Sequence, residues 1–367
     1  MKATREAYES FTEWGKYMNE IFQQKVEEAK AGKCNNAIGG MDIMGSLVKT
    51  SYGPDKEKAQ LNKISLKDEE IIGDMFIIVV AGHETTANAV HFALLQLALN
   101  PRTQRLLQKE IDSIFNGQDP TEWDYDECVN RLTGSIVGSV MNEILRVMPS
   151  VIVIPKRVTK NSPQHLTLAG KSHELPAGVT INLNAVGASR NPKYWPSGGP
   201  SKISGKTDDL DDFVPERWMV KNDDTESAHL SASEQTDSED ESNQGPRGPD
   251  TSTHLFRPVR GSYLPFSDGA RSCLGRRFAQ VEVLVILAVI FQKYSIELAV
   301  DEWASDGDVD KMKIGGPERK AVYEKARVSG REKLAGASSL LTLKLQHGSI
   351  PVRVVKRGEE RFISSID

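Results

Sequence analysis

The chain has 367 residues, of which 38% are hydrophobic and 26% are charged, and its formal net charge is -5 at pH 7. This composition is typical of soluble globular proteins, and the length is sufficient for a sizeable core. The negative charge argues against a nucleic-acid partner, because neither a basic face nor stacking aromatic residues accompany it. The three cysteines, Cys34, Cys128 and Cys273, are too few and too scattered for a disulfide framework. We therefore expect a reducing compartment.

The first residues, MKATREAYESFTEW, contain no apolar core, so we expect neither a signal peptide nor a membrane anchor there. The longest apolar runs, residues 75–81 and 283–291, are far shorter than the ~20 residues that a membrane span needs. We expect no transmembrane segment in this chain.

Residues 3–31 carry apolar side chains at helical spacing, which predicts a surface helix packed on a core. These side chains are Tyr8, Phe11, Trp14, Met18, Phe22 and Val26. Residues 32–64, with their Gly, Asn and Lys, predict a loop. A long helix should begin at Ser65, where Asp68 completes a capping box, and should end before Pro101. Its middle, FIIVVAG, is apolar on all faces, which predicts that this helix passes through the interior.

Periodicity and turn signals predict the remaining elements. Helices are expected at residues 101–115, 130–148, 185–194 and 276–294. Short strands are expected at residues 151–154, 166–168, 179–183, 340–345 and 352–355. Residues 221–253 are rich in Ser, Asp and Glu and cannot bury enough apolar surface to offset the entropy of ordering. We expect a disordered acidic insertion there, either a solvated loop or a phosphorylation site, and a smaller insertion at residues 197–209.

One cysteine lies in a glycine-rich frame. Gly269 and Gly275 remove side-chain bulk on both sides of Cys273, so a planar cofactor could approach the backbone. The predicted helix that follows favours an anion at its first turn, which suits a thiolate. Arg271 could pair with a carboxylate of the cofactor, and Phe266 could pack on its ring. The pattern indicates a thiolate ligand for a large flat metal cofactor; the alternative is an ordinary buried cysteine.

A second unusual segment, AGHETT, lies in the middle of the long predicted helix at residues 81–86. A glycine and two threonines are unfavourable in a helix interior, so they need a reason. Ala81 and Gly82 would leave room for a ligand or a cofactor face. Glu84 and Thr85 could hold water and relay protons. The alternative is a polar patch without a function.

A third pattern places Glu143 and Arg146 on one face of a predicted helix, because they are three positions apart. Any amphipathic helix can carry such a pair, so the pair gains meaning only from its order in the chain. Arg217 lies further along, within the stretch Pro215-Glu216-Arg217-Trp218.

Taken together, these motifs resemble those of the cytochrome P450 family, the haem-thiolate monooxygenases. The family's cysteine-pocket signature, Phe-x-x-Gly-x-Arg-x-Cys-x-Gly, is matched by Phe266, Gly269, Arg271, Cys273 and Gly275. Its oxygen-activating helix signature, Ala/Gly-Gly-x-Asp/Glu-Thr-Thr, is matched by Ala81, Gly82, Glu84, Thr85 and Thr86. Its Glu-x-x-Arg pair is matched by Glu143 and Arg146, and Arg217 resembles the arginine that joins this pair in a triad.

The resemblance covers roughly residues 1–356 and is greatest to eukaryotic microsomal members. It implies a mainly α fold with small β-sheets (α+β). We expect residues 1–367 to form a single partial P450 domain that lacks the family's N-terminal helices and first sheet, with the acidic insertion at 221–253 inside it.

The resemblance also implies roles for the motif residues. Cys273 would be the proximal metal ligand of heme b (iron protoporphyrin IX), and Arg271 would pair with a propionate. Glu84 and Thr85 would deliver protons on the opposite face, beside Ala81 and Gly82 in the distal pocket. The remaining three residues would form a structural ion network: Glu143, Arg146 and Arg217. Residues 151–153 would either favour a hydrophobic substrate or belong to a core strand.

The implied reaction inserts one oxygen atom from O2 into a small hydrophobic substrate. Electrons would come from NADPH through a separate flavoprotein reductase, at the cytoplasmic face of the endoplasmic reticulum membrane. The alternative is a truncated, non-catalytic P450-like protein that binds haem poorly or only binds partners.

Overall fold

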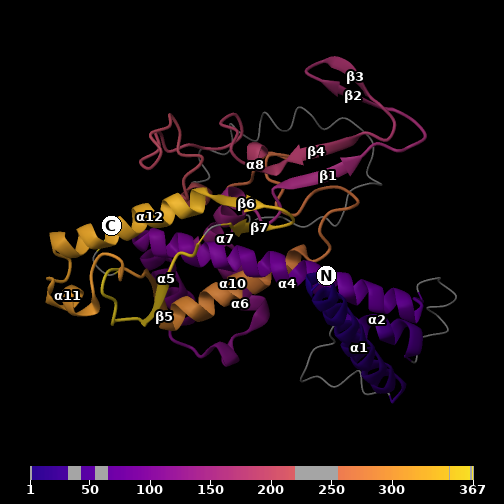
Figure 1. Cartoon of the computed structure of the whole chain (residues 1–367), viewed down its shortest axis with the longest axis horizontal. Helices are drawn as coiled ribbons and strands as arrows, with labels where there is room; N and C mark the ends of the chain where they lie inside the picture. Colours follow the sequence, from indigo (N-terminus) through magenta and orange to yellow (C-terminus); the bar gives the residue numbers. More distant parts are fainter. Residues whose placement is uncertain are drawn as a thin grey trace. The chain divides into compact units, whose positions relative to one another are not determined.

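A computed structural model describes residues 2–31, 43–53, 65–219, 255–346, 348–363 and 366. The acidic insertion expected at 221–253 lies outside the described residues. Within them the fold is mainly α-helical, with four two-stranded antiparallel sheets, which confirms the predicted fold class (Figure 1). The chain divides into two compact units, Met1–Glu84 and Thr85–Asp367.

The first unit contains helix α1 (Lys2–Lys30), helix α2 (Ile43–Tyr52) and the beginning of α4 (Asp68–Leu99). Its core consists of Met18, Phe22, Val26, Ala29, Met44, Val48 and Ile71. The predicted α1 stripe is therefore correct in its second half, whereas Tyr8 and Phe11 are exposed. Helix α2 replaces part of the loop expected at 32–64, because Met44 and Val48 lie one turn apart and bury one face.

The start of α4 differs from the predicted capping box. The Ser65 hydroxyl donates to the Ser51 hydroxyl at 3.3 Å, and the Glu70 carboxylate accepts the Lys67 N–H at 2.8 Å. The middle of α4 also differs, because Ile77 and Val80 are 56% and 43% exposed. An apolar run shows which side chains could be buried. The described residues leave part of the FIIVVAG run uncovered.

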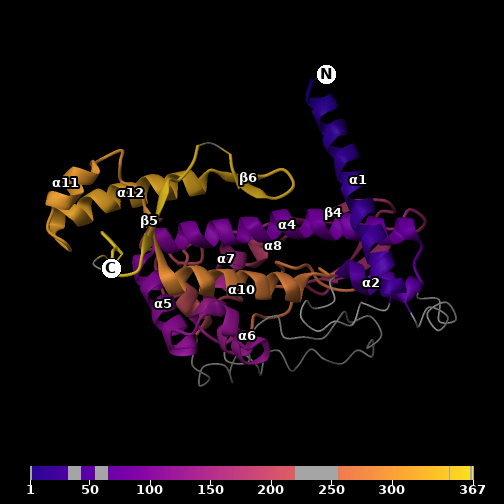
Figure 2. The same ribbon diagram turned by 90° about the horizontal axis from the view of Figure 1, so that it is seen from below.

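The second unit is built around the rest of α4 and three further core helices. These are α5 (Pro101–Phe115), α7 (Ile136–Val147) and α10 (Arg276–Lys293). Helix α10 packs against α5, α7 and the short helix α6 (Tyr125–Thr133) (Figure 2). Buried side chains from all of these helices form one continuous core.

The single helix expected at 130–148 is wrong, since α6 and α7 are separated at Gly134 and Ser135. The Ser135 hydroxyl accepts the Val137 N–H at 3.1 Å and so caps the start of α7. Glycine is a poor helix former and serine is a favoured N-cap, so the break follows from local chemistry.

All four sheets belong to the second unit. Their pairings are β1 (Val153–Arg157) with β4 (Thr180–Asn184), β2 (Gln164–Leu168) with β3 (Lys171–Leu175), β5 (Tyr294–Leu298) with β8 (Val352–Lys356), and β6 (Ala337–Ser339) with β7 (Leu343–Leu345). The remaining elements are η2 (Pro120–Glu122), α8 (Ala185–Ala188), η3 (Pro215–Trp218), α11 (Asp306–Lys311) and α12 (Pro317–Ala335). Among the described residues, none of the helices combines the length and the apolar character that a bilayer span requires.

We predict that Gly138→Ala destabilises the second unit, because a β-carbon at Gly138 would lie 2.1 Å from the Thr133 carbonyl oxygen. Such overpacking should lower the free energy of unfolding by about 3 kcal/mol. The control is Gly15→Ala in α1, where a β-carbon meets no described atom within 4 Å. That change should stabilise by roughly 0.5 kcal/mol through helix propensity. Urea denaturation followed by circular dichroism measures both, and equal effects would contradict the packing of α6 against α7.

Candidate active site

The carboxylate of Glu143, on α7, is fully buried and accepts five hydrogen bonds. Its Oε1 accepts from Arg146 Nη2 at 2.8 Å, Val214 N at 2.9 Å and Arg217 Nε at 3.0 Å. Its Oε2 accepts from Arg146 Nε at 2.7 Å and Trp218 Nε1 at 2.8 Å. Two guanidinium groups, one indole and one backbone amide therefore share a single buried anion.

Arg146 uses its remaining donors to hold loops against α7. Its Nη1 donates to the carbonyls of Ser189 at 3.0 Å and Leu210 at 2.7 Å, and its Nη2 donates to that of Asp212 at 3.2 Å. The guanidinium also lies 5.3 Å from the centre of the Trp195 ring, a cation–π distance. Arg146 has no exposed surface, so each of these bonds replaces water.

Arg217 lies on η3 and makes the same kind of connection. Its Nη1 donates to the Pro196 carbonyl at 2.6 Å and to the Asp209 carboxylate at 3.3 Å, and its Nη2 donates to the Asp209 carbonyl at 2.9 Å. The structure thus brings together the three residues named for the ion network: Glu143, Arg146 and Arg217. The sequence interpretation gave no role to the Trp218 indole, although a buried Trp N–H normally requires an acceptor.

The charges in this network determine the ionisation of Glu143. Burial alone would raise the pKa of Glu143, but the nearby Arg146 and Arg217 guanidinium groups and the hydrogen bonds outweigh burial and lower it. Asp209 behaves in the same way, because Arg217 and hydrogen bonds from Ser197 and Gly198 lower its pKa despite partial burial. Glu143 is therefore an anion at neutral pH.

The cysteine frame forms a tight loop before α10. The Cys273 N–H donates to the Phe266 carbonyl at 2.8 Å, and the Ser272 N–H donates to the Gly269 carbonyl at 2.9 Å. Gly269 has a φ of +79°, a conformation that suits glycine. Gly275 is the N-cap of α10, so Cys273 lies two residues before the cap.

The residues of this loop fit a haem held through sulfur. Cys273 and Arg271 are exposed, and Phe266 is partly buried against the core. A β-carbon at Gly275 would meet no described atom within 4 Å, so packing within the described chain does not require glycine there. A soft thiol ligand, a cation that can pair with a carboxylate and a glycine on each side of the cysteine suit a flat anionic metal cofactor.

The residues named for the distal side lie at the boundary between the two units. Ala81, Gly82 and Glu84 belong to the first unit, and Thr85 begins the second. Ala81 and Gly82 are exposed, whereas Glu84 and Thr85 are partly buried. Thr85 has one contact with a distant residue of the second unit, because its carbonyl accepts the Ser150 hydroxyl at 2.7 Å.

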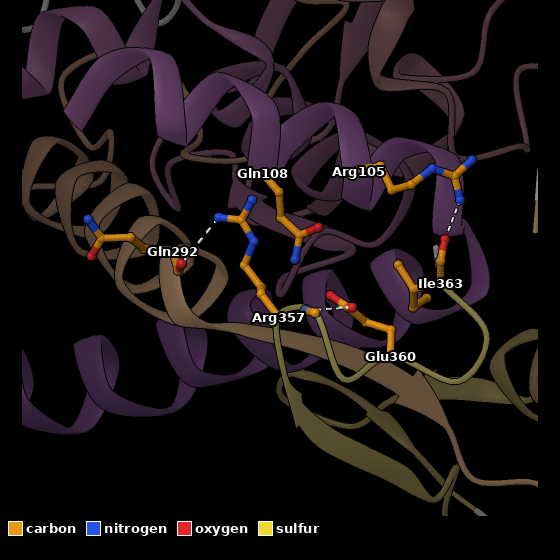
Figure 3. Close-up of a pocket in the computed structure, with 7 residues that line it drawn as sticks. Arg105, Gln108, Gln292, Arg357, Glu360 and Ile363 are labelled. Carbon is orange, nitrogen blue, oxygen red and sulfur yellow. Dashed lines mark hydrogen bonds between the residues drawn. The ribbon is translucent and has the colours of Figure 1, made fainter. Parts of the chain in front are cut away.

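A cavity of about 460 Å³ lies elsewhere in the second unit, between α5, the end of α10 and residues 357–363 (Figure 3). It is lined by Arg105, Gln108, Gln292, Arg357, Gly358, Glu360 and Ile363. Arg357 is already paired with Asp112 at 2.7 Å, and Glu360 accepts the Ser295 hydroxyl at 2.8 Å and the Gly358 N–H at 2.7 Å. None of the residues predicted for the site lines this cavity.

We predict that Glu143→Gln lowers the free energy of unfolding by about 3–5 kcal/mol, because both guanidinium groups would lose their buried anion. The lowered pKa of Glu143 means that its stabilisation is complete above the ordinary carboxyl pKa of about 4.3 and is lost as the pH falls through the folded-state pKa. The difference between the wild type and Glu143→Gln should therefore shrink in acid.

The matched control is Glu127→Gln on α6. Glu127 pairs with Arg131 at 3.5 Å, but both side chains are exposed, so the loss should stay below about 1 kcal/mol. Denaturation of all three proteins between pH 3 and pH 7 measures these differences. A loss of equal size for the two variants would contradict the importance of burial.

A family profile and several curated proteins match this sequence. The sequence profile of the family described as "Cytochrome P450" matches residues 3–318. Cytochrome P450 monooxygenase ORF6 of Penicillium roqueforti is 27% identical over 332 residues, which are 86% of this chain and 50% of that protein. Cytochrome P450 monooxygenase prx9 of Penicillium rubens is 27% identical over 86% of this chain and 50% of its own length. Cytochrome P450 3A13 of Mus musculus is 27% identical over 64% of this chain and 35% of its own length.

The chain thus spans about half the length of the two Penicillium relatives. The family implies a haem-iron cofactor, which agrees with the chemistry of the Cys273 loop. On the profile match, the chain belongs to the cytochrome P450 family.

Proposed function

We propose that this chain is part of a haem-thiolate monooxygenase that inserts one oxygen atom from O2 into a small hydrophobic substrate. The observation that carries the proposal is the exposed Cys273, held in a glycine loop at the head of α10. The names of the two Penicillium relatives include the word monooxygenase, which supports the same reaction class.

The cofactor that we propose is heme b. Cys273 would bind its iron as a thiolate, Arg271 would pair with a propionate and Phe266 would pack on the ring. Gly269 and Gly275 would allow the ring to approach the backbone. When bound, a thiolate-ligated haem supplies the one-electron and O2 chemistry of the reaction.

The chain's own residues have three tasks in this proposal. The dipole at the start of α10 would favour a thiolate ligand at Cys273. Glu84 and Thr85 hold water and move protons on the face of the haem opposite Cys273, where O2 would bind. A carboxylate and a hydroxyl can relay protons through a bound water. Ala81 and Gly82 have little side chain and leave room for the substrate.

We further infer the source of electrons and the location of the protein. Electrons come from NADPH through a separate flavoprotein reductase, and the protein works at the cytoplasmic face of the endoplasmic reticulum membrane. Both inferences rest on the resemblance of the motifs to those of eukaryotic microsomal members.

A second candidate function is a non-catalytic relative that binds haem poorly or only binds partners. The matches to the curated relatives cover about half of their length, so haem binding has to be measured on these residues themselves. Haem binding by the chain itself separates the two candidates.

We predict that the 367-residue chain, supplied with haemin, reduced and exposed to carbon monoxide, gives the red-shifted Soret band of a thiolate-ligated haem. Cys273→Ala should abolish this band, because the sulfur ligand is removed. Cys128→Ala is the matched control, since Cys128 is buried in the core and should leave the band unchanged. A wild-type chain without the band would favour the second candidate, and a band retained in Cys273→Ala would refute the assigned ligand.

We also predict that Thr85→Ala lowers the amount of product formed per NADPH severalfold while haem uptake is unchanged. Its hydroxyl would be missing from the proton relay, so reducing equivalents would be consumed without oxygen insertion. Thr133→Ala on α6 is the control, because that partly buried hydroxyl donates to the Val129 carbonyl at 2.7 Å, far along the chain from the AGHETT segment. Undiminished coupling in Thr85→Ala would remove Thr85 from the relay.

A further inference from the structure

Three hydrogen bonds connect α4 to two distant segments in a closed ring. The Ser150 hydroxyl donates to the Thr85 carbonyl at 2.7 Å, and the Leu343 N–H donates to the Ser150 carbonyl at 2.9 Å. Asn88 Nδ2 donates to the Thr342 hydroxyl at 3.2 Å. Thr342 and Leu343 are neighbours, and Asn88 follows Thr85 by one helical turn. The ring therefore begins and ends on α4.

The ring joins parts of the chain that local structure does not bring together. Ser150 lies 65 positions from Thr85, and Thr342 lies 254 positions from Asn88. Ser150 belongs neither to α7, which ends at Val147, nor to β1, which begins at Val153. Its side-chain bond is therefore a tertiary contact and not a helix cap or a turn.

Two members of the ring are buried, and Thr85 and Asn88 are partly buried. Ser150 is 8% exposed and Thr342 is 5% exposed. Hydrogen bonds in such surroundings are electrostatically stronger than at the surface, and an unpaired group there is costly. We expect the three bonds to hold α4, Ser150 and the β6–β7 hairpin in one fixed arrangement.

We propose that Ser150 is the positioning residue for Thr85, and that the ring through the β6–β7 hairpin holds it in place. A helix carbonyl normally accepts the N–H four residues later, which for Thr85 is that of Ala89. A second donor from outside the helix fixes the direction of that carbonyl and hence the local path of the helix. This inference rests on the proposed function, because a proton relay through Thr85 requires that Thr85 has a fixed position.

The first test measures hydrogen–deuterium exchange on the 367-residue chain without haem. In Ser150→Ala, the amides of residues 85–90 and 342–343 should exchange roughly two- to tenfold faster, the range expected for one lost buried hydrogen bond. Ser150→Thr keeps the hydroxyl and should restore slow exchange. The matched control is Ser139→Ala, which removes a buried hydrogen bond from the Ser139 hydroxyl to the Ser135 carbonyl at 3.1 Å, at the start of α7. Unchanged exchange in Ser150→Ala would overturn the proposal.

The second test asks whether the bonds act as a unit. Asn88→Ala opens the ring at its other link and should also accelerate exchange at 85–90. Because either change opens the same ring, the double variant should exchange more slowly than the product of the two single effects predicts. Effects that simply multiply would show independent bonds and overturn the ring.

The third test measures product formed per NADPH in the haem-loaded chain. Ser150→Ala should lower this ratio, Ser150→Thr should restore it, and Ser150→Ala should cause no further loss when added to Thr85→Ala. Faster exchange with full coupling would show a purely structural bond and overturn the positioning role. A chain that takes up no haem would refute the proposed function instead, and the exchange tests would still decide whether the ring exists.

Discussion

The second unit depends on one buried carboxylate. Removing Glu143 from water costs several kcal/mol, and the structure offsets this with five donors from α7, η3 and the residue before η3. The two arginines that neutralise it are held in turn by backbone carbonyls between Ser189 and Asp212. The irregular segment between Ser189 and Asp212 therefore has a fixed path, because several of its carbonyls accept hydrogen bonds from the two buried arginines.

The carboxylate also connects to the cysteine loop through aromatic rings. Trp218, which donates to Glu143, has its ring centre 5.2 Å from that of Tyr263 in an edge-on arrangement. The Tyr263 hydroxyl donates to the Asn142 carbonyl on α7 at 3.2 Å, and Tyr263 precedes Phe266 by three residues. Tyr263, just before the Cys273 loop, is thus connected to α7 in two ways: directly through Asn142, and through Trp218 to Glu143. The ion network contributes to the site by fixing where this loop begins.

The sequence was sufficient where structure is local. Pro101 at the start of α5 is a short-range signal, and the helix at residues 101–115 was predicted with the observed bounds. Helix α12 was missed, because its sequence is charged on most faces and carries no clear apolar stripe. The exposure of Ile77 and the bond from Ser150 to Thr85 could not be predicted, since both depend on which distant residues are nearby. Roles for Cys273, Arg271 and Thr85 came from motif order and remain predictions.

Helix α7 explains how one short element can serve both sides of the proposed chemistry. All twelve of its residues are buried, so it cannot shift without disturbing the core. Asn142, Glu143 and Arg146 contact the segments that lead to the cysteine loop, and Ser150 follows three residues after the helix ends. The Ser150 hydroxyl then meets α4 at Thr85. The separation between the Cys273 loop and Thr85 is therefore set by a rigid helix and its immediate continuation. This is a physical reason for a polar network, and not an apolar core, to be buried here.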